Sequence, residues 1–190
     1  MPPIAPNAEL GELMKTGVPE SKRAEVWRVF LRCDKLKSNY PAGYYKRLIQ
    51  LSKEVMTNQS TAQKEIFQID KDLGRTMPKC KMFQSEEGLA TLRRVLYAYA
   101  LRNPDLVGYC QGMNFVCAGL LTVLSEEDAF WGLCVLIEIR LGYYTPTMAS
   151  LKVDQNVLNR MISYKHPKLY RHMGKLGVSI FAFTTSWYSR

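Results

Sequence analysis

The chain has 190 residues, of which 47% are hydrophobic and 23% are charged, values that are ordinary for a single globular domain. A chain of this length can bury a sizeable core without disulfides or a structural metal. Its formal net charge of +9 suits an acidic partner, but the basic residues are spread thinly and form no run of five like charges. We therefore expect solvated helix faces rather than a nucleic-acid-binding surface, and no nucleic-acid partner.

The N-terminus and the apolar runs indicate where the protein acts. The first six residues are proline-rich rather than basic and then apolar, so no signal sequence is predicted. The longest apolar runs, 113–124 and 129–139, are too short to span a bilayer. We expect a cytoplasmic protein, either free or bound peripherally to an intracellular membrane.

The five cysteines occur without a CxxC pair, which indicates buried free thiols in a reducing cytosol. Cys110 lies beside the polar centre described below and could be a nucleophile. The two histidines, His166 and His172, stand far along the chain, so only the fold could bring a base to that thiol. No metal-ligating cluster is indicated.

The first part of the chain predicts short helices separated by turns. The first amphipathic helix carries an apolar stripe at three- and four-residue spacing, formed by Ala24, Trp27, Phe30 and Leu31. Arg23 stands one turn before Trp27, so its guanidinium could lie against the indole or tie down a neighbouring loop. A turn at 39–43 leads to another helix, and 55–60 is predicted to be a polar linker.

The next helix ends where the polar centre begins. Thr61 can cap its start, and its buried stripe includes Ile69 and Leu73. Gly74 is expected to end this helix in the left-handed conformation, because glycine has no Cβ to oppose it. Arg75 then lies on the exit loop.

The second half predicts longer, more apolar helices. Ser85 and Ser125 are each followed by two acids, a pattern typical of helix N-termini. Residues 113–124 are apolar nearly all round, which indicates a central buried helix, and Gln111 stands just before it. Residues 178–188 fit either a strand or a helix. Together these patterns predict an all-α fold of about eight to ten helices.

Arg75 and Gln111 allow two interpretations. In the structural one, Arg75 pairs with Asp70 or Asp72, and Gln111 caps its own helix. In the functional one, the neighbouring glycines let the backbone or phosphate of a partner come close to both side chains. The sequence shows no nucleophile–base pair and no Gly-rich phosphate loop. An arginine and a glutamine alone would therefore complete a site on a partner that brings nucleotide and magnesium.

The spacing of these residues matches a known pattern. The stretch Ile69-x-x-Asp72-x-x-Arg75, followed by Tyr109-x-Gln111, resembles the two signature motifs of the TBC domain. That family comprises GTPase-activating domains that act on Rab-type small GTPases.

Two further segments agree with this resemblance. Residues 17–19, leading to Arg23-x-x-x-Trp27, resemble the opening motif of the family, and 187–188 resemble the aromatic pair that begins its later half. The proline-rich, aperiodic start of the chain predicts a disordered tail over 1–10. The resemblance implies the N-terminal lobe of a TBC domain over 11–190, with the C-terminal lobe absent.

The resemblance implies a mechanism with two fingers. Arg75 would be the arginine finger that neutralises charge on the transferring phosphoryl oxygens, and Gln111 would be the glutamine finger that orients the attacking water. Asp72 would orient Arg75 or contact the GTPase. Ile69 and Tyr109 would pack and set the angles of the two loops. The chain would have no independent active site and no cofactor, since the partner Rab GTPase would carry GTP and Mg²⁺.

One alternative function comes from another class of protein. Without the second lobe, the chain could be a helical interaction scaffold that binds a GTPase or a vesicle-trafficking partner without activating it.

Overall fold

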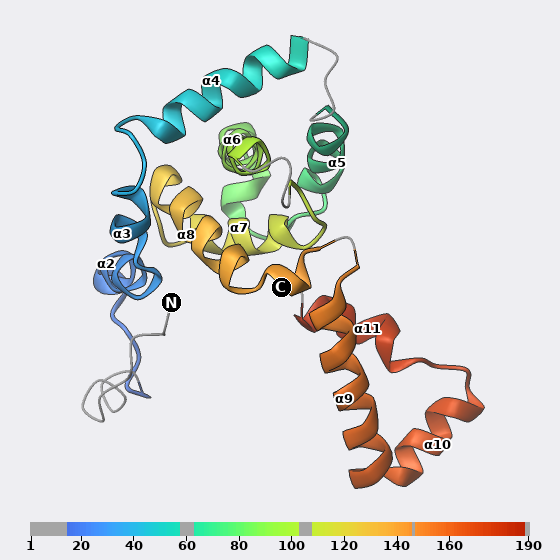
Figure 1. Ribbon diagram of the computed structural model, residues 1–190. Coiled ribbons are helices and arrows are strands. Elements are labelled where there is room, and N and C mark those ends of the chain that lie inside the picture. The colour runs from blue at the N-terminus through green and yellow to red at the C-terminus, as the bar shows by residue number, and fades with distance from the viewer. Residues whose placement is uncertain (1–14, 58–62, 103–107, 146, 189–190) are drawn as a thin grey trace.

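The computed structural model describes residues 15–57, 63–102, 108–145 and 147–188 (Figure 1). In these ranges the chain forms ten α-helices and two short 3₁₀ helices, and no strand, so the prediction of an all-α fold with eight to ten helices is confirmed. The predicted tail over 1–10 and the proposed cap Thr61 lie outside the described residues. The elements are α2 (Glu20–Leu31), α3 (Cys33–Lys37), α4 (Tyr44–Thr57), α5 (Gln63–Leu73), η1 (Lys81–Gln84), α6 (Glu86–Arg102), α7 (Met113–Leu121), α8 (Glu126–Ile139), η2 (Leu141–Tyr143), α9 (Ala149–Lys165), α10 (Pro167–Lys175) and α11 (Ile180–Tyr188).

Helix α6 runs through the centre of the molecule, with α4, α5, α7 and α8 around it (Figure 1). Residues 95–100 are buried on every side of this helix. The predicted helix after Gly108 is present as α7, and its residues Met113, Cys117 and Ala118 are fully buried. Burying each large apolar side chain contributes about 1.5–3 kcal/mol, so this central stack is the main source of stability.

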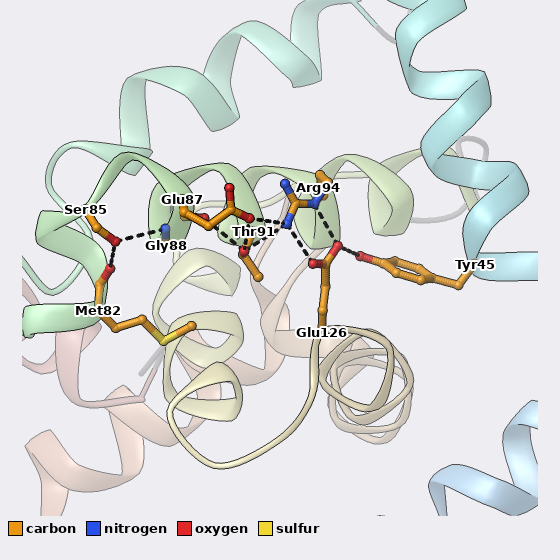
Figure 2. Close-up of polar contacts among 8 residues, drawn as sticks. All are labelled: Tyr45, Met82, Ser85, Glu87, Gly88, Thr91, Arg94 and Glu126. Atoms are coloured by element: carbon orange, nitrogen blue, oxygen red, sulfur yellow. Dashed lines mark hydrogen bonds and ion pairs between the residues drawn. The ribbon is translucent and has the colours of Figure 1, made fainter.

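Both predicted serine caps are present. Ser125 Oγ accepts the backbone N–H of Asp128 at the start of α8. Ser85 Oγ accepts the N–H of Gly88 at 3.1 Å at the start of α6 (Figure 2). A Cβ at Gly88 would lie 1.8 Å from the carbonyl oxygen of Met82, so only glycine fits beneath η1. The cap and the glycine together fix how α6 enters the core.

A polar clamp joins three helices of the core. The guanidinium of Arg94 on α6 forms two hydrogen bonds with the Glu126 carboxylate on α8, at 2.7 and 2.8 Å. The hydroxyl of Tyr45 on α4 donates to the same carboxylate at 2.7 Å (Figure 2). The hydrogen bond from Arg94 lowers the pKa of Glu126, although partial burial opposes that shift. The carboxylate therefore stays ionised while it holds α4 and α6 against α8.

Two local predictions were wrong. Residues 55–57 of the polar linker predicted over 55–60 are helical, because α4 continues to Thr57, and the rest of that segment lies outside the described residues. Gly74 does not adopt a left-handed conformation, and Met77 does so instead with a φ of 46°. Helix α5 ends in tight turns, where the N–H groups of Arg75 and Thr76 each donate to a carbonyl three residues earlier. The helix therefore ends where predicted, just before Gly74, but the left-handed residue comes three residues later than expected.

Helices α9, α10 and α11 form a separate arm beside the core (Figure 1). The ambiguous segment 178–188 is helical over most of its length, as α11. Its Thr184 and Thr185 hydroxyls each accept a hydrogen bond from the amide of Gln155 on α9, at 3.2 and 3.0 Å. The helical form of α11 is therefore accompanied by side-chain hydrogen bonds to α9. Within the described ranges, every helix is too short or too polar to cross a membrane.

Candidate functional site

Arg75 lies at the exit of α5, anchored on one side and open on the other. Its Nη2 is 2.6 Å from Oδ1 of Asp72, whose side chain is fully buried, while the Arg75 side chain is 53% exposed. Asp70 is engaged elsewhere, since its carboxylate accepts hydrogen bonds from Arg93 and from the hydroxyl of Tyr97. Of the two carboxylates that the sequence offered to Arg75, the structure selects Asp72. The pairing orients the guanidinium without covering it.

Asp72 also holds the loop that leads to Gln111. The hydroxyl of Tyr109 donates to Oδ2 of Asp72 at 2.7 Å, and the amide of Gln68 donates to Oδ1 at 3.3 Å. Burial raises the pKa of Tyr109, and the hydrogen bond to the Asp72 carboxylate raises it further. A buried carboxylate is stable only when its oxygens are paired, so Asp72 needs Tyr109 as much as it needs Arg75.

A second contact joins the same two loops. The amide of Asn114 donates to Thr76 Oγ1 at 2.7 Å, and the Thr76 hydroxyl donates to the backbone oxygen of Asp72 at 2.6 Å. The Asn114 carbonyl oxygen accepts the N–H of Gly112 at 3.1 Å. Thr76 and Asn114 are buried, and our sequence analysis did not select either one. Their one local signal is that each is a polar residue within an apolar pattern.

Gln111 is exposed in the loop before α7. The N-cap of α7 is Gly112, which has a φ of 106°, and no side-chain hydrogen bond caps the helix there. Gln111 therefore does not cap this helix, although the structural interpretation required it to do so. Asn114 satisfies the nearby N–H of Gly112 instead. Gln111 therefore stands beside the Arg75 loop without a capping task, on a backbone that Tyr109 and Asn114 hold in place.

The other residues of the signature motif serve as supports. Ile69 is fully buried on α5. Arg23 donates its Nε–H to the carbonyl oxygen of Val18 at 3.1 Å, so it ties down the loop before α2, which was one of its two predicted roles. Trp27 is 38% exposed, and α2 contains no buried residue, so the predicted apolar stripe is only partly covered. Helix α2 lies across the molecule from α5 (Figure 1).

The residues suited to other chemistry lie apart from one another. The described part of the chain holds no group of three His, Cys, Asp or Glu side chains that could bind a metal ion. Burial raises the pKa of the Cys110 thiol, which disfavours the thiolate that a nucleophile needs. His166 and His172 lie on the arm, at the start of α10 and within it. Among the described residues, the raised pKa of Cys110 and the position of both histidines on the arm give no support to a Cys–His pair.

Solved structures with the same fold are known. The Chlamydomonas flagellar RabGAP TBC domain has a TM-score of 0.76 and 29% sequence identity, over 100% of this chain and 60% of that one. The Ypt/Rab-GAP domain of Gyp1p has a TM-score of 0.68 and 21% identity, over 95% of this chain and 66% of that one, and shows the fold alone.

The family is defined by the sequence match. The Rab-GTPase-TBC domain family matches residues 20–190, so the chain belongs to that family. TBC1 domain family member 2B of Homo sapiens is 38% identical in an alignment of 186 residues that covers 95% of this chain and 19% of that protein. The chain therefore spans about a fifth of the length of this relative.

Proposed function

We propose that this chain is a GTPase-activating domain for Rab-type small GTPases, and that it supplies Arg75 and Gln111 in trans. One observation carries the proposal: two exposed polar side chains stand on loops that buried hydrogen bonds tie together, through Tyr109 to Asp72 and through Asn114 to Thr76. Membership of the Rab-GTPase-TBC family supports the same function. The partner would bring GTP and Mg²⁺, and the chain would act in the cytoplasm or peripherally on an intracellular membrane.

The arrangement around Arg75 suits the chemistry of phosphoryl transfer. Asp72 occupies one edge of the guanidinium, and an arginine has five N–H donors in a planar fork. The open edge can therefore meet two phosphate oxygens at once, which a lysine ammonium cannot do. An arginine finger supplied in trans accelerates hydrolysis roughly 10³–10⁵-fold, equivalent to about 4–7 kcal/mol of barrier. Gln111, on the adjoining loop, would orient the attacking water.

The test is single-turnover GTP hydrolysis by a panel of Rab proteins, with and without the chain. We expect Arg75→Lys to reduce the acceleration roughly 10³-fold or more, because the bidentate contact is lost. Gln111→Ala should also reduce it strongly. Arg93→Lys is the matched control, since Arg93 is a half-exposed arginine on α6 that pairs with Asp70 on α5. An Arg75→Lys variant that activates as well as the parent would refute the finger assignment. Binding to a Rab without acceleration would favour the scaffold.

A further inference from the structure

Glu65 on α5 is pressed against the start of the loop that carries Gln111. Gly108, the first described residue of that loop, is buried. A Cβ at Gly108 would lie 1.9 and 2.0 Å from the two carboxylate oxygens of Glu65. Real atoms cannot approach so closely, so this contact exists only because residue 108 is glycine. The carboxylate therefore rests directly on the loop backbone.

The environment of this carboxylate is unusual. Its Oε2 is buried and has no hydrogen-bond partner among the described residues. Burial raises the pKa of Glu65, and a hydrogen bond from the backbone N–H of Tyr109 offsets part of that increase. A buried carboxylate oxygen of this kind is destabilising, and native proteins rarely keep one that has no further task.

The contact with Gly108 stands beside a second attachment of the same loop to α5. The hydroxyl of the next residue, Tyr109, donates to Asp72, two turns after Glu65 on that helix. Seven residues of helix span about 10 Å, so the loop is attached to α5 at two well-separated points. Asp72 also holds Arg75. A single helix thus sets both the backbone before Gln111 and the guanidinium of Arg75.

We propose that Glu65 is a positioning residue for Gln111, acting through the contact of its carboxylate with Gly108. This inference rests on the proposed function, because the placement of Gln111 matters only if Gln111 enters the GTPase site. Glu65 itself touches no substrate in this account. It fixes where the loop before α7 contacts α5, and thereby where the Gln111 carboxamide is presented.

The test is a double-mutant cycle on the complete chain with Glu65→Ala, Gly108→Ala and both changes together. Single-turnover GTP hydrolysis gives the maximal rate at saturating chain and, separately, the concentration for half-maximal effect. A misplacement of about 1 Å can reduce a rate roughly 100-fold, so we expect Gly108→Ala to lower the maximal rate at least roughly tenfold, with the half-maximal concentration little changed. In the double variant, the space left by Glu65 accommodates the new methyl group. Its rate should then return to that of Glu65→Ala.

The glycine control is Gly119→Ala on α7, where an added Cβ meets nothing within 4 Å. It should match the parent in rate, and match or slightly exceed it in melting temperature, because alanine is the better helix former. A second readout is amide hydrogen exchange of the peptide covering 108–114, which should be faster in Glu65→Ala because the loop loses its contact with the carboxylate at Gly108. This measurement decides the matter even if Gly108→Ala alone does not fold.

The outcomes separate this inference from the proposed function. If the two single effects multiply in the double variant, or if exchange over 108–114 is unchanged in Glu65→Ala, the positioning role is wrong while the Arg75 test stands. If Arg75→Lys and Gln111→Ala leave activation intact, the proposed function fails, and the positioning of a glutamine finger fails with it.

Discussion

The core helices α4–α8 and the arm α9–α11 differ in which side chains they bury and which they expose. In the core, buried polar groups such as Asp72, Thr76 and Asn114 are paired with each other or with neighbouring loops. The arm also pairs its buried Gln155 with Thr184, but in addition it exposes a series of large apolar side chains: Val153, Val157, Met161, Tyr164, Leu169 and Leu176. A pocket on α9 is lined by Val153, Val157 and Arg160 among other residues.

This difference shows where the precision of the candidate site comes from. Arg75 and Gln111 are held by hydrogen bonds that lead into the densely packed core, and none of those bonds involves the arm. Changes in the core should therefore affect stability and activation together. Changes on exposed positions of the arm should leave the folding of the chain largely unaltered.

The largest expected effect comes from a matched pair of leucines. Leu92 on α6 is 0% exposed, and Leu169 on α10 is 49% exposed. Leu92→Ala should lower the free energy of unfolding by about 2–5 kcal/mol, because it removes buried methyl groups and leaves a cavity. Leu169→Ala should change it by about 0.5 kcal/mol or less, as is usual for surface positions. Urea denaturation measures both, and similar losses would show that core and arm are packed alike.

The next effect concerns the carboxylate that joins the two loops. Asp72→Ala removes the acceptor for Tyr109 and the partner of Arg75, so the free energy of unfolding should fall by about 3 kcal/mol. Activation should fall as well, because Arg75 is no longer oriented. Asp154→Ala, on the arm, is the control with which the losses of stability and activation in Asp72→Ala are compared. Loss of stability without loss of activation would mean that Arg75 finds its position independently of Asp72.

The local features of this fold follow from the sequence because their causes are local. Ser85 and Ser125 begin their helices as predicted, since a cap depends on residues within one turn. The end of α5 depends on distant contacts. Thr76 is fixed by Asn114, 38 residues away, and the left-handed residue falls at Met77 rather than at Gly74.

The candidate site divides in the same way. The positions of Arg75 and Gln111 on loops could be predicted from the sequence, because each residue stands next to a helix end. The contacts that hold these loops could not be predicted, because each joins segments that are far apart in the sequence. They are the contact of Glu65 with Gly108 and the hydrogen bond of Tyr109 to Asp72. The partial exposure of Trp27 has the same origin, because periodicity shows which face is apolar and not whether another element covers it.

A smaller effect is expected from the second contact between the loops. Asn114→Ala leaves the N–H of Gly112 without its acceptor and Thr76 Oγ1 without its donor, which should cost about 1–3 kcal/mol of stability. Asn156→Ala, at an exposed position of α9, is the matched control. It should be neutral or slightly stabilising, because alanine is the better helix former. Thermal unfolding of both variants makes the comparison, and equal melting temperatures would argue against the Asn114 bridge.

The smallest effect is a pH dependence of the clamp around Glu126. Hydrogen bonds from Arg94 and Tyr45 lower the pKa of Glu126 below its ordinary value of 4.5. A carboxylate with a lowered folded-state pKa stabilises the fold above its unfolded-state pKa, and that contribution disappears as the pH falls through the folded-state value. Parent and Glu126→Gln should therefore differ by about 1 kcal/mol between pH 5 and 7, and the difference should shrink below pH about 4.5. A difference that stays constant down to pH 3 would mean that the charge of Glu126 adds nothing to the attachment of α4 and α6 to α8.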